Sequence, residues 1–188
     1  MRLFVAIDVS DETRAQLRRV REQLAPRLAL VARPPRVTWV ADGAAHVTIR
    51  FIGEVSDGVA EQVRAAMAPS LAGPAYTIDF SDVGVFPKGS RPRVVWIGAN
   101  RGQEETTAIS AAVHQRLDPI IGAGESRPFR AHLTVARVKE PRAFDWNAAL
   151  ATIDSGHTRS LVDHVTLYQS RTSPAGPTYT PLCTTWMS

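Results

Sequence analysis

The chain has 188 residues, of which 44% are hydrophobic and 21% are charged, a composition typical of a soluble globular protein. Its formal net charge of +4 favours polyanionic partners, and its lone cysteine, Cys183, excludes an intrachain disulfide and a cysteine-based zinc cluster. No apolar stretch is long enough for a membrane span or a signal-peptide core, so we expect a cytoplasmic protein without membrane contact.

Hydrophobic periodicity predicts the elements of the first part of the chain. Continuous apolar runs bounded by turn residues indicate strands, while apolar residues three and four apart, preceded by Ser or Asp, indicate helices. In chain order the predicted elements are a strand at 3–9, a helix beginning at Ser10 and Asp11, a loop at 30–36, a strand at 37–40, a turn at 42–43, a strand from His46 to Gly53 and a helix beginning at Ser56 and Asp57.

The same criteria predict the elements of the remaining chain. In chain order these are a strand at 76–86, a basic loop at 88–93, a strand at 94–97, a helix at 104–121, a glycine-rich loop at 122–124, a strand beginning at His132, a short helix near 146–153, a strand at 161–168 and a turn-rich tail at 174–181.

The order of these elements indicates the fold class. Strands and helices are mixed without strict βαβ regularity, which favours an α+β fold with mainly antiparallel sheet over a doubly wound parallel sheet. No linker rich in Gly, Ser or Pro is long enough to separate domains. We therefore expect residues 1–188 to form a single compact domain with two similar halves.

The pattern His, apolar, Thr, apolar occurs at 46–49 and again at 132–135. Successive side chains of a strand point to opposite faces, so His and Thr share one face while the apolar residues anchor the other face in a core. Two such strands facing one another across a cleft would place two proton-transfer groups and two hydroxyl donors around one anion. The two copies therefore predict a site for phosphate chemistry.

A third copy of the pattern, at 164–167, also falls in a predicted strand, so the pattern by itself nominates three histidines. Arg50 follows His46 by four residues and Arg137 follows His132 by five, whereas the third copy has no arginine at these offsets. Strand parity places Arg50 on the face of His46 but places Arg137 on the face opposite to His132. Arg137 therefore reaches the site only if its strand ends, twists or bulges.

Longer runs around these motifs resemble one enzyme family. The runs are 1–7, 46–54, 85–96, 127–137 and 167–170, followed by Tyr179. In this order they are similar to bacterial and archaeal RNA 2',3'-cyclic phosphodiesterases, formerly called 2'-5' RNA ligases, of the two-histidine phosphoesterase superfamily. Two positions depart from the family pattern: Ala131 stands where the family usually has Pro, and 43–45 lacks the polar residues often seen before the first histidine.

The resemblance implies a bilobal fold with pseudo-twofold symmetry, helices on the outside and both motifs in a central cleft. It also implies hydrolysis of the 2',3'-cyclic phosphate ends of RNA to 2'-phosphomonoesters, with neither a metal nor a cofactor. His46 would be the proton donor and His132 the proton acceptor, while Thr48 and Thr134 would bind the phosphate. His164 falls in a family strand that carries no catalytic histidine, so we expect its role to be structural.

Several basic and aromatic residues are candidates for substrate contacts. The candidate substrate contacts are Arg50, Arg93, Phe129 and Arg137. The aromatic residues that could stack on a base, or could equally be buried, are Trp39, Phe86, Trp96 and Phe129. The loop at 91–93 either follows RNA phosphates or forms a solvated turn. We expect His114 and His157 to face solvent.

The implied partners are RNAs with 2',3'-cyclic phosphate ends, such as tRNA fragments, or cyclic nucleotides, and the sequence indicates no obligate protein partner. Two alternatives stay open at this point. One is a binding module that holds RNA ends or nucleotides without turning them over. The other is a ligase that joins RNA halves through 2'-5' bonds.

Overall fold

The computed structural model describes residues 1–89, 91–124, 127–142, 144–173 and 176–188. The strands are β1 (Arg2–Asp8), β2 (Arg36–Trp39), β3 (His46–Glu54), β4 (Tyr76–Phe86), β5 (Val94–Ala99), β6 (His132–Glu140), β7 (Thr158–Val162), β8 (His164–Ser173) and β9 (Gly176–Trp186). The helices are α1 (Asp11–Ala29), the short 3-10 helix η1 (Asp42–Ala44), α2 (Asp57–Met67), α3 (Gln103–Ile121) and α4 (Trp146–Ala151).

The strands form one curved antiparallel sheet in the order β7-β4-β5-β6-β3-β1-β8-β9, and β2 pairs with the outer part of β6. The two halves of this sheet, β7-β4-β5-β6 and β3-β1-β8-β9, join between β6 and β3 through the backbone pair Val47 and Leu133. The predicted α+β class with mainly antiparallel sheet is confirmed.

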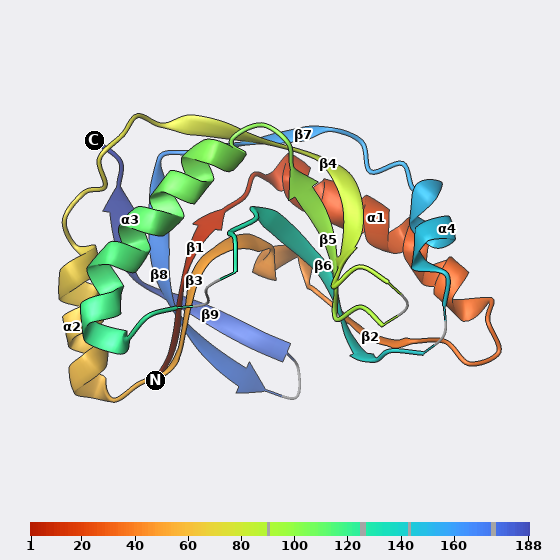
Figure 1. The fold of residues 1–188 in the computed structure, drawn as a ribbon, viewed down its shortest axis with the longest axis horizontal. Coiled ribbons are helices and arrows are strands. Elements are labelled where there is room, and N and C mark those ends of the chain that lie inside the picture. The colour runs from red at the N-terminus through yellow and green to blue at the C-terminus, as the bar shows by residue number, and fades with distance from the viewer. Residues whose placement is uncertain (90, 125–126, 143, 174–175) are drawn as a thin grey trace.

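Helices cover the outer face of each half, as Figure 1 shows. Helices α2 and α3 pack on the half that contains β3, and α1 and α4 pack on the half that contains β6. The residues of β1 explain how the two faces of the sheet differ. Leu3, Val5 and Ile7 are at most 1% exposed and belong to the apolar core cluster. Phe4, Ala6 and the half-buried Asp8 alternate with them on the other face, outside that cluster.

Each half is covered partly by a helix that follows a strand of the other half. Helix α1 follows β1 but packs on β6 and β7, and Gln16 donates a hydrogen bond of 2.9 Å to the carbonyl of Phe80 in β4. Helix α3 follows β5 but packs on β3, where the Ser110 hydroxyl donates to the carbonyl of Ile49. These two crossing helices therefore tie the halves of the sheet together.

Two predictions about the end of the chain were wrong. The predicted strand 161–168 is divided at Asp163, because β7 pairs with β4 in one half and β8 pairs with β1 in the other. The tail, predicted to be rich in turns, forms β9 from residue 176 onward, while 174–175 lie outside the described residues. A strand that contains Pro177 and Pro181 is possible there because β9 lies at the sheet edge, where a missing N–H costs little.

Within the described ranges, no helix combines the length and the apolar character that crossing a bilayer requires.

Candidate active site

The pairing of β3 with β6 brings the two His-x-Thr motifs together. Val47 lies opposite Leu133 in an antiparallel register, so one step along each strand places His46 opposite Thr134 and Thr48 opposite His132. The apolar residues of both motifs, Val47, Ile49, Leu133 and Val135, are at most 3% exposed on the core face. The two histidines and two threonines therefore share the other face, arranged around a local twofold axis, as the alternation predicted.

Both imidazoles are oriented by the same backbone contact. His46 Nδ1 lies 2.8 Å from the carbonyl of Ala44, and His132 Nδ1 lies 2.7 Å from the carbonyl of Arg130. A carbonyl oxygen only accepts hydrogen bonds, so Nδ1 carries the proton in each ring. The nitrogen that remains for proton transfer is Nε2 in both cases.

The electrostatic surroundings of the two imidazoles are distinguished by a carboxylate. Burial lowers the pKa of His46, opposed by the bond to the Ala44 carbonyl and by the charge of Asp8, and Arg137 and His132 lower it further. Burial also lowers the pKa of His132, opposed by the bond to the backbone, and Arg137 again lowers it. The Asp8 carboxylate thus favours the imidazolium form of His46, while burial, the Arg130 carbonyl and Arg137 account for the pKa of His132.

The strands that flank the two motifs explain this difference. Asp8 pairs with His46 between β1 and β3, and Gly98 pairs with His132 between β5 and β6. The two pairs occupy equivalent positions in the two halves. A Cβ atom built on Gly98 would lie 2.8 Å from the indole ring of Trp96, so the fold leaves no room for a side chain beside His132.

A β-bulge follows the threonine of each motif and reverses the strand parity. Thr48 pairs with Ala6 but Arg50 pairs with Val5, so the residue of β3 between Thr48 and Arg50 has no partner in β1. The equivalent residue of β6 has no partner in β5. The prediction that Arg50 lies on the face of His46 is therefore wrong. The Arg50 side chain is 5% exposed, and its guanidinium donates to Asp118 at 2.9 Å and to the Gly122 carbonyl at 2.8 Å.

The same irregularity has the opposite consequence for Arg137. The bulge in β6 turns Ala136 into the core and places Arg137 on the face of His132 and Thr134, where it is exposed. Its charge lowers the pKa of both His46 and His132. The bulge that strand parity required for Arg137 to reach the site is present.

The local symmetry places Phe51 at the position that corresponds to Arg137. Phe51 pairs with Phe4, as Arg137 pairs with Val94, and the residue is 56% exposed. The guanidinium carbon of Arg2 lies 5.2 Å from the centre of this ring. The face that carries the two motifs is therefore not symmetric at its ends. The guanidinium of Arg137 lies beyond Thr134, and the ring of Phe51 lies beyond Thr48.

The remaining candidates for substrate contacts and base stacking differ in how close they lie to the two histidines. Arg93 is exposed beside the start of β5, in a predicted loop of which Ser90 lies outside the described residues. Phe129 is half-buried and packs against the core. Phe86 lies edge-on to His132 at 5.3 Å and stacks on Trp96 at 4.9 Å.

The predictions for the two remaining histidines had different outcomes. His157 is exposed, as expected, and its Nε2 lies 3.4 Å from Asp79. His114 was expected to face solvent, but it is half-buried beside the guanidinium of Arg50, with Nδ1 3.0 Å from Nη1. The reason is that the bulge in β3 directs Arg50 toward α3.

A cavity of about 250 Å³ adjoins His46 and contains residues that sequence reasoning missed as site residues. It is lined by Asp8, Arg14, Gly43, Ala44, Ala45, His46, Tyr168, Tyr179 and Pro181. The alternation of side chains along β1 is a sequence signal that could have predicted Asp8 on the same face as His46. Tyr179 lies in the segment predicted to be turns, and its ring stands edge-on to His46 at 5.3 Å. Among the described side chains, no group of three or more His, Cys, Asp or Glu is arranged to hold a metal ion.

Comparison with known proteins places these features in a family context. The profile of the 2'-5' RNA ligase superfamily matches residues 9–174. An RNA 2',3'-cyclic phosphodiesterase of Archaeoglobus fulgidus is 33% identical over 184 residues, covering 97% of this chain and 98% of its own. A protein of the same name from Thermotoga maritima is 28% identical over 182 residues, covering 95% of this chain and 91% of its own.

Solved structures share the fold. Escherichia coli LigT complexed with 3'-AMP superimposes with a TM-score of 0.74 at 26% identity, over 100% of this chain and 98% of LigT. The protein TT0787 of Thermus thermophilus superimposes with a TM-score of 0.75 over 99% of this chain and 97% of its own, at 24% identity.

Proposed function

Because the chain belongs to the 2'-5' RNA ligase superfamily, we propose that it hydrolyses the 2',3'-cyclic phosphate ends of RNA to 2'-phosphomonoesters. Relatives named RNA 2',3'-cyclic phosphodiesterase that align over nearly the whole chain support this activity. The observation that carries the proposal is the arrangement of His46, Thr48, His132 and Thr134 on one face of two adjacent strands. Two proton-transfer groups and two hydroxyl donors around one point suit a cyclic phosphodiester.

In the proposed reaction the phosphate lies between the two imidazoles. Neutral His132 accepts a proton at Nε2 from a water molecule, whose oxygen attacks phosphorus. The bond between phosphorus and the ribose 3'-oxygen breaks, and protonated His46 donates its Nε2 proton to that oxygen. Atoms and charge balance without any further reactant, because one water molecule is consumed and the histidine protonation states are exchanged.

The hydroxyl and guanidinium groups supply the electrostatic part of the mechanism. The Thr48 and Thr134 hydroxyls donate to the two non-bridging oxygens, which gain negative charge as the water attacks. Arg137 is exposed on the same face and its charge already acts on both imidazoles, so it offers a charged donor to the same oxygens. The exposed ring of Phe51 offers a surface on which a nucleobase could stack.

The roles of donor and acceptor are supported by the carboxylate of Asp8, which has no counterpart beside His132. The donor must be protonated before the reaction and the acceptor must be neutral. Asp8 beside His46 favours the imidazolium form, and Gly98 beside His132 provides no such charge. This difference supports His46 as the proton donor and His132 as the proton acceptor.

The experiment that tests the proposal is product analysis with an oligoribonucleotide that ends in a 2',3'-cyclic phosphate and a separate acceptor with a 5'-hydroxyl. Hydrolysis gives a 2'-phosphate end, and the His46→Ala and His132→Ala variants should each lose it. A 2'-5' linked dimer would instead identify ligation, and binding without a product would identify a binding module. Nucleoside 2',3'-cyclic monophosphate and cleaved tRNA, used in parallel, separate small substrates from RNA fragments.

A further inference from the structure

The third copy of the His-x-Thr pattern, at 164–167, does not join the two motifs of the candidate active site. Strand β8 runs antiparallel beside β1, where Thr166 pairs with Ala6. Continued by two residues along each strand, this register places His164 opposite Asp8. Asp8 itself pairs with His46 across β1 and β3. The side chains of His46, Asp8 and His164 therefore form a row across three neighbouring strands.

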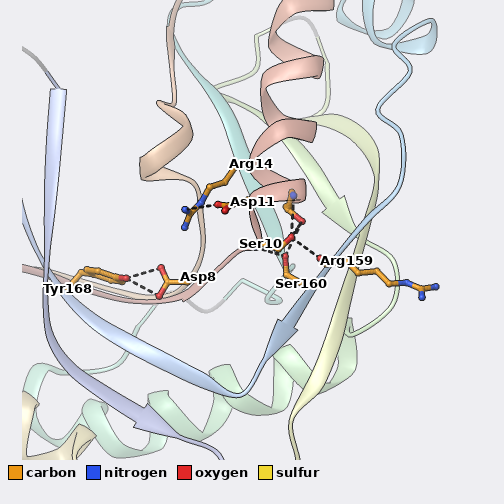
Figure 2. A network of polar contacts seen from close by, with 8 residues as sticks. Asp8, Ser10, Asp11, Arg14, Arg159, Ser160 and Tyr168 are labelled. Atoms are coloured by element: carbon orange, nitrogen blue, oxygen red, sulfur yellow. Dashed lines mark hydrogen bonds and ion pairs between the residues drawn. The ribbon is translucent and has the colours of Figure 1, made fainter.

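Residues of β8 hold the Asp8 carboxylate from the side away from His46. The Tyr168 hydroxyl donates to Oδ1 at 2.8 Å and Oδ2 at 2.9 Å, and Figure 2 shows it pointing directly at the carboxylate. The Thr166 hydroxyl donates to Oδ2 at 3.4 Å, and His164 Nε2 lies 3.8 Å from the same oxygen. Burial, with the bond to Asp8, raises the pKa of Tyr168 to about 12, so its hydroxyl keeps its proton at neutral pH.

We propose that Asp8 is a positioning residue, fixed by Tyr168, Thr166 and His164, which acts through His46 to make it the proton donor of the pair. The inference rests on the proposed hydrolysis, but it explains a feature that hydrolysis alone does not, the presence of a third His-x-Thr strand. In this arrangement His164 faces a carboxylate instead of the phosphate. Its imidazole is also engaged by Asp163, with Nδ1 2.5 Å from Oδ1.

Several charged and titratable groups from neighbouring elements face His46 and Asp8. Those that face His46 are Asp8 from β1, His132 and Arg137 from β6, and Tyr179 from β9. Those that face Asp8 are His46, His164 and Tyr168, while Arg14 from α1 lines the same cavity. Because Arg137 and His132 both disfavour the imidazolium form of His46, the carboxylate of Asp8 is the charge among these groups that opposes them.

The test is the Asp8→Asn variant of the full chain, with kcat/KM measured against pH on a cyclic-phosphate oligoribonucleotide. Asparagine keeps the shape of the side chain and can still accept the Tyr168 hydrogen bond, but it removes the charge. His46 should then lose its proton at a lower pH, so the alkaline limb of the profile moves to lower pH and the acid limb stays. One unit of displacement lowers kcat/KM about tenfold on the alkaline side.

A second variant tests the contacts that hold the carboxylate. Tyr168→Phe should displace the alkaline limb in the same direction and by less, because it frees the carboxylate without removing it. The matched control is Tyr76→Phe, which removes a hydroxyl that donates to Thr106 Oγ1 at 3.0 Å, away from the site. The pKa of Tyr76 is likewise about 12. This control should leave the profile unchanged.

A merely structural role of Asp8 predicts a different result. Equal loss of kcat/KM at every pH, an unchanged alkaline limb or a displaced acid limb would each overturn the proposal. Titration of the His46 ring by NMR in wild type and Asp8→Asn reads the same effect without turnover. A lower pKa of His46 in the variant is expected, and an unchanged pKa would refute the inference even if the proposed hydrolysis itself failed.

Discussion

Two arginines that follow the two motifs are expected to have opposite effects when they are replaced by methionine. Arg50 lies in the core beside α3, while Arg137 lies exposed on the face of the histidines. Arg50→Met should destabilise the protein and leave turnover within about threefold of wild type. Arg137→Met should leave stability within about 0.5 kcal/mol, as exposed substitutions usually do, and reduce turnover.

The magnitude for Arg50→Met follows from its contacts. Its guanidinium donates to Asp118 at 2.9 Å and to the Gly122 carbonyl at 2.8 Å, and hydrogen bonds of charged groups contribute roughly 1.5–3 kcal/mol each. The Asp118 side chain is 36% exposed, so it is solvated again after the substitution and this contribution is reduced. Methionine preserves the packing of the aliphatic stem. We expect a loss of about 2–3 kcal/mol in the free energy of unfolding.

The magnitude for Arg137→Met follows from the loss of one charged donor to phosphate oxygens. A contact of about 1.5–3 kcal/mol corresponds to a reduction of roughly 10- to 100-fold in kcat/KM. Urea unfolding followed by circular dichroism measures stability, and hydrolysis of a cyclic-phosphate oligonucleotide, well below the unfolding temperature, measures turnover. Each variant is the matched control of the other. If Arg50→Met remained stable and lost as much turnover as Arg137→Met, the assignment of the two arginines to opposite faces would be wrong.

Three further predictions concern the histidines and the proposed chemistry. His46→Ala and His132→Ala should each reduce turnover by at least ~10²-fold, whereas His164→Ala should stay within about tenfold, and equal losses in all three would contradict the choice of pair. Burial lowers the pKa of both His46 and His132, so the bell-shaped profile of kcat/KM should have its maximum on the acid side of the ordinary histidine pKa of about 6.5. The alkaline limb marks loss of the His46 proton and the acid limb marks protonation of His132, and a maximum above about pH 8 would contradict this account. Addition of a chelator should leave the rate unchanged, and full inhibition would indicate a metal hydrolase.

Much of the candidate site follows from the sequence because it depends only on strand alternation. A strand that reads His, apolar, Thr, apolar must present His and Thr on one face once its apolar residues are buried, and both copies do so. The resemblance over long runs of the chain likewise indicated the family that the superfamily profile matches.

The positions that the sequence did not determine depend on backbone irregularities and on pairing between distant strands. A β-bulge adds one residue without a distinctive sequence signal, yet it moved Arg50 into the core and Arg137 onto the site face. The assignment of 161–168 to one strand failed because both segments have the residue pattern of a strand and only their partners differ. Local periodicity carries no information about such partners.

The sequence by itself therefore determined that His and Thr share a face within each motif, since the side-chain period of a regular strand is a property of its own backbone. Tertiary structure alone decided which faces meet and in what register. It placed Thr48 opposite His132 through one backbone pair of β3 and β6, and it placed Asp8 between His46 and the third motif through the register of β1 with β8. Register is fixed by the packing of the whole core, and a segment read in isolation contains no measure of that packing.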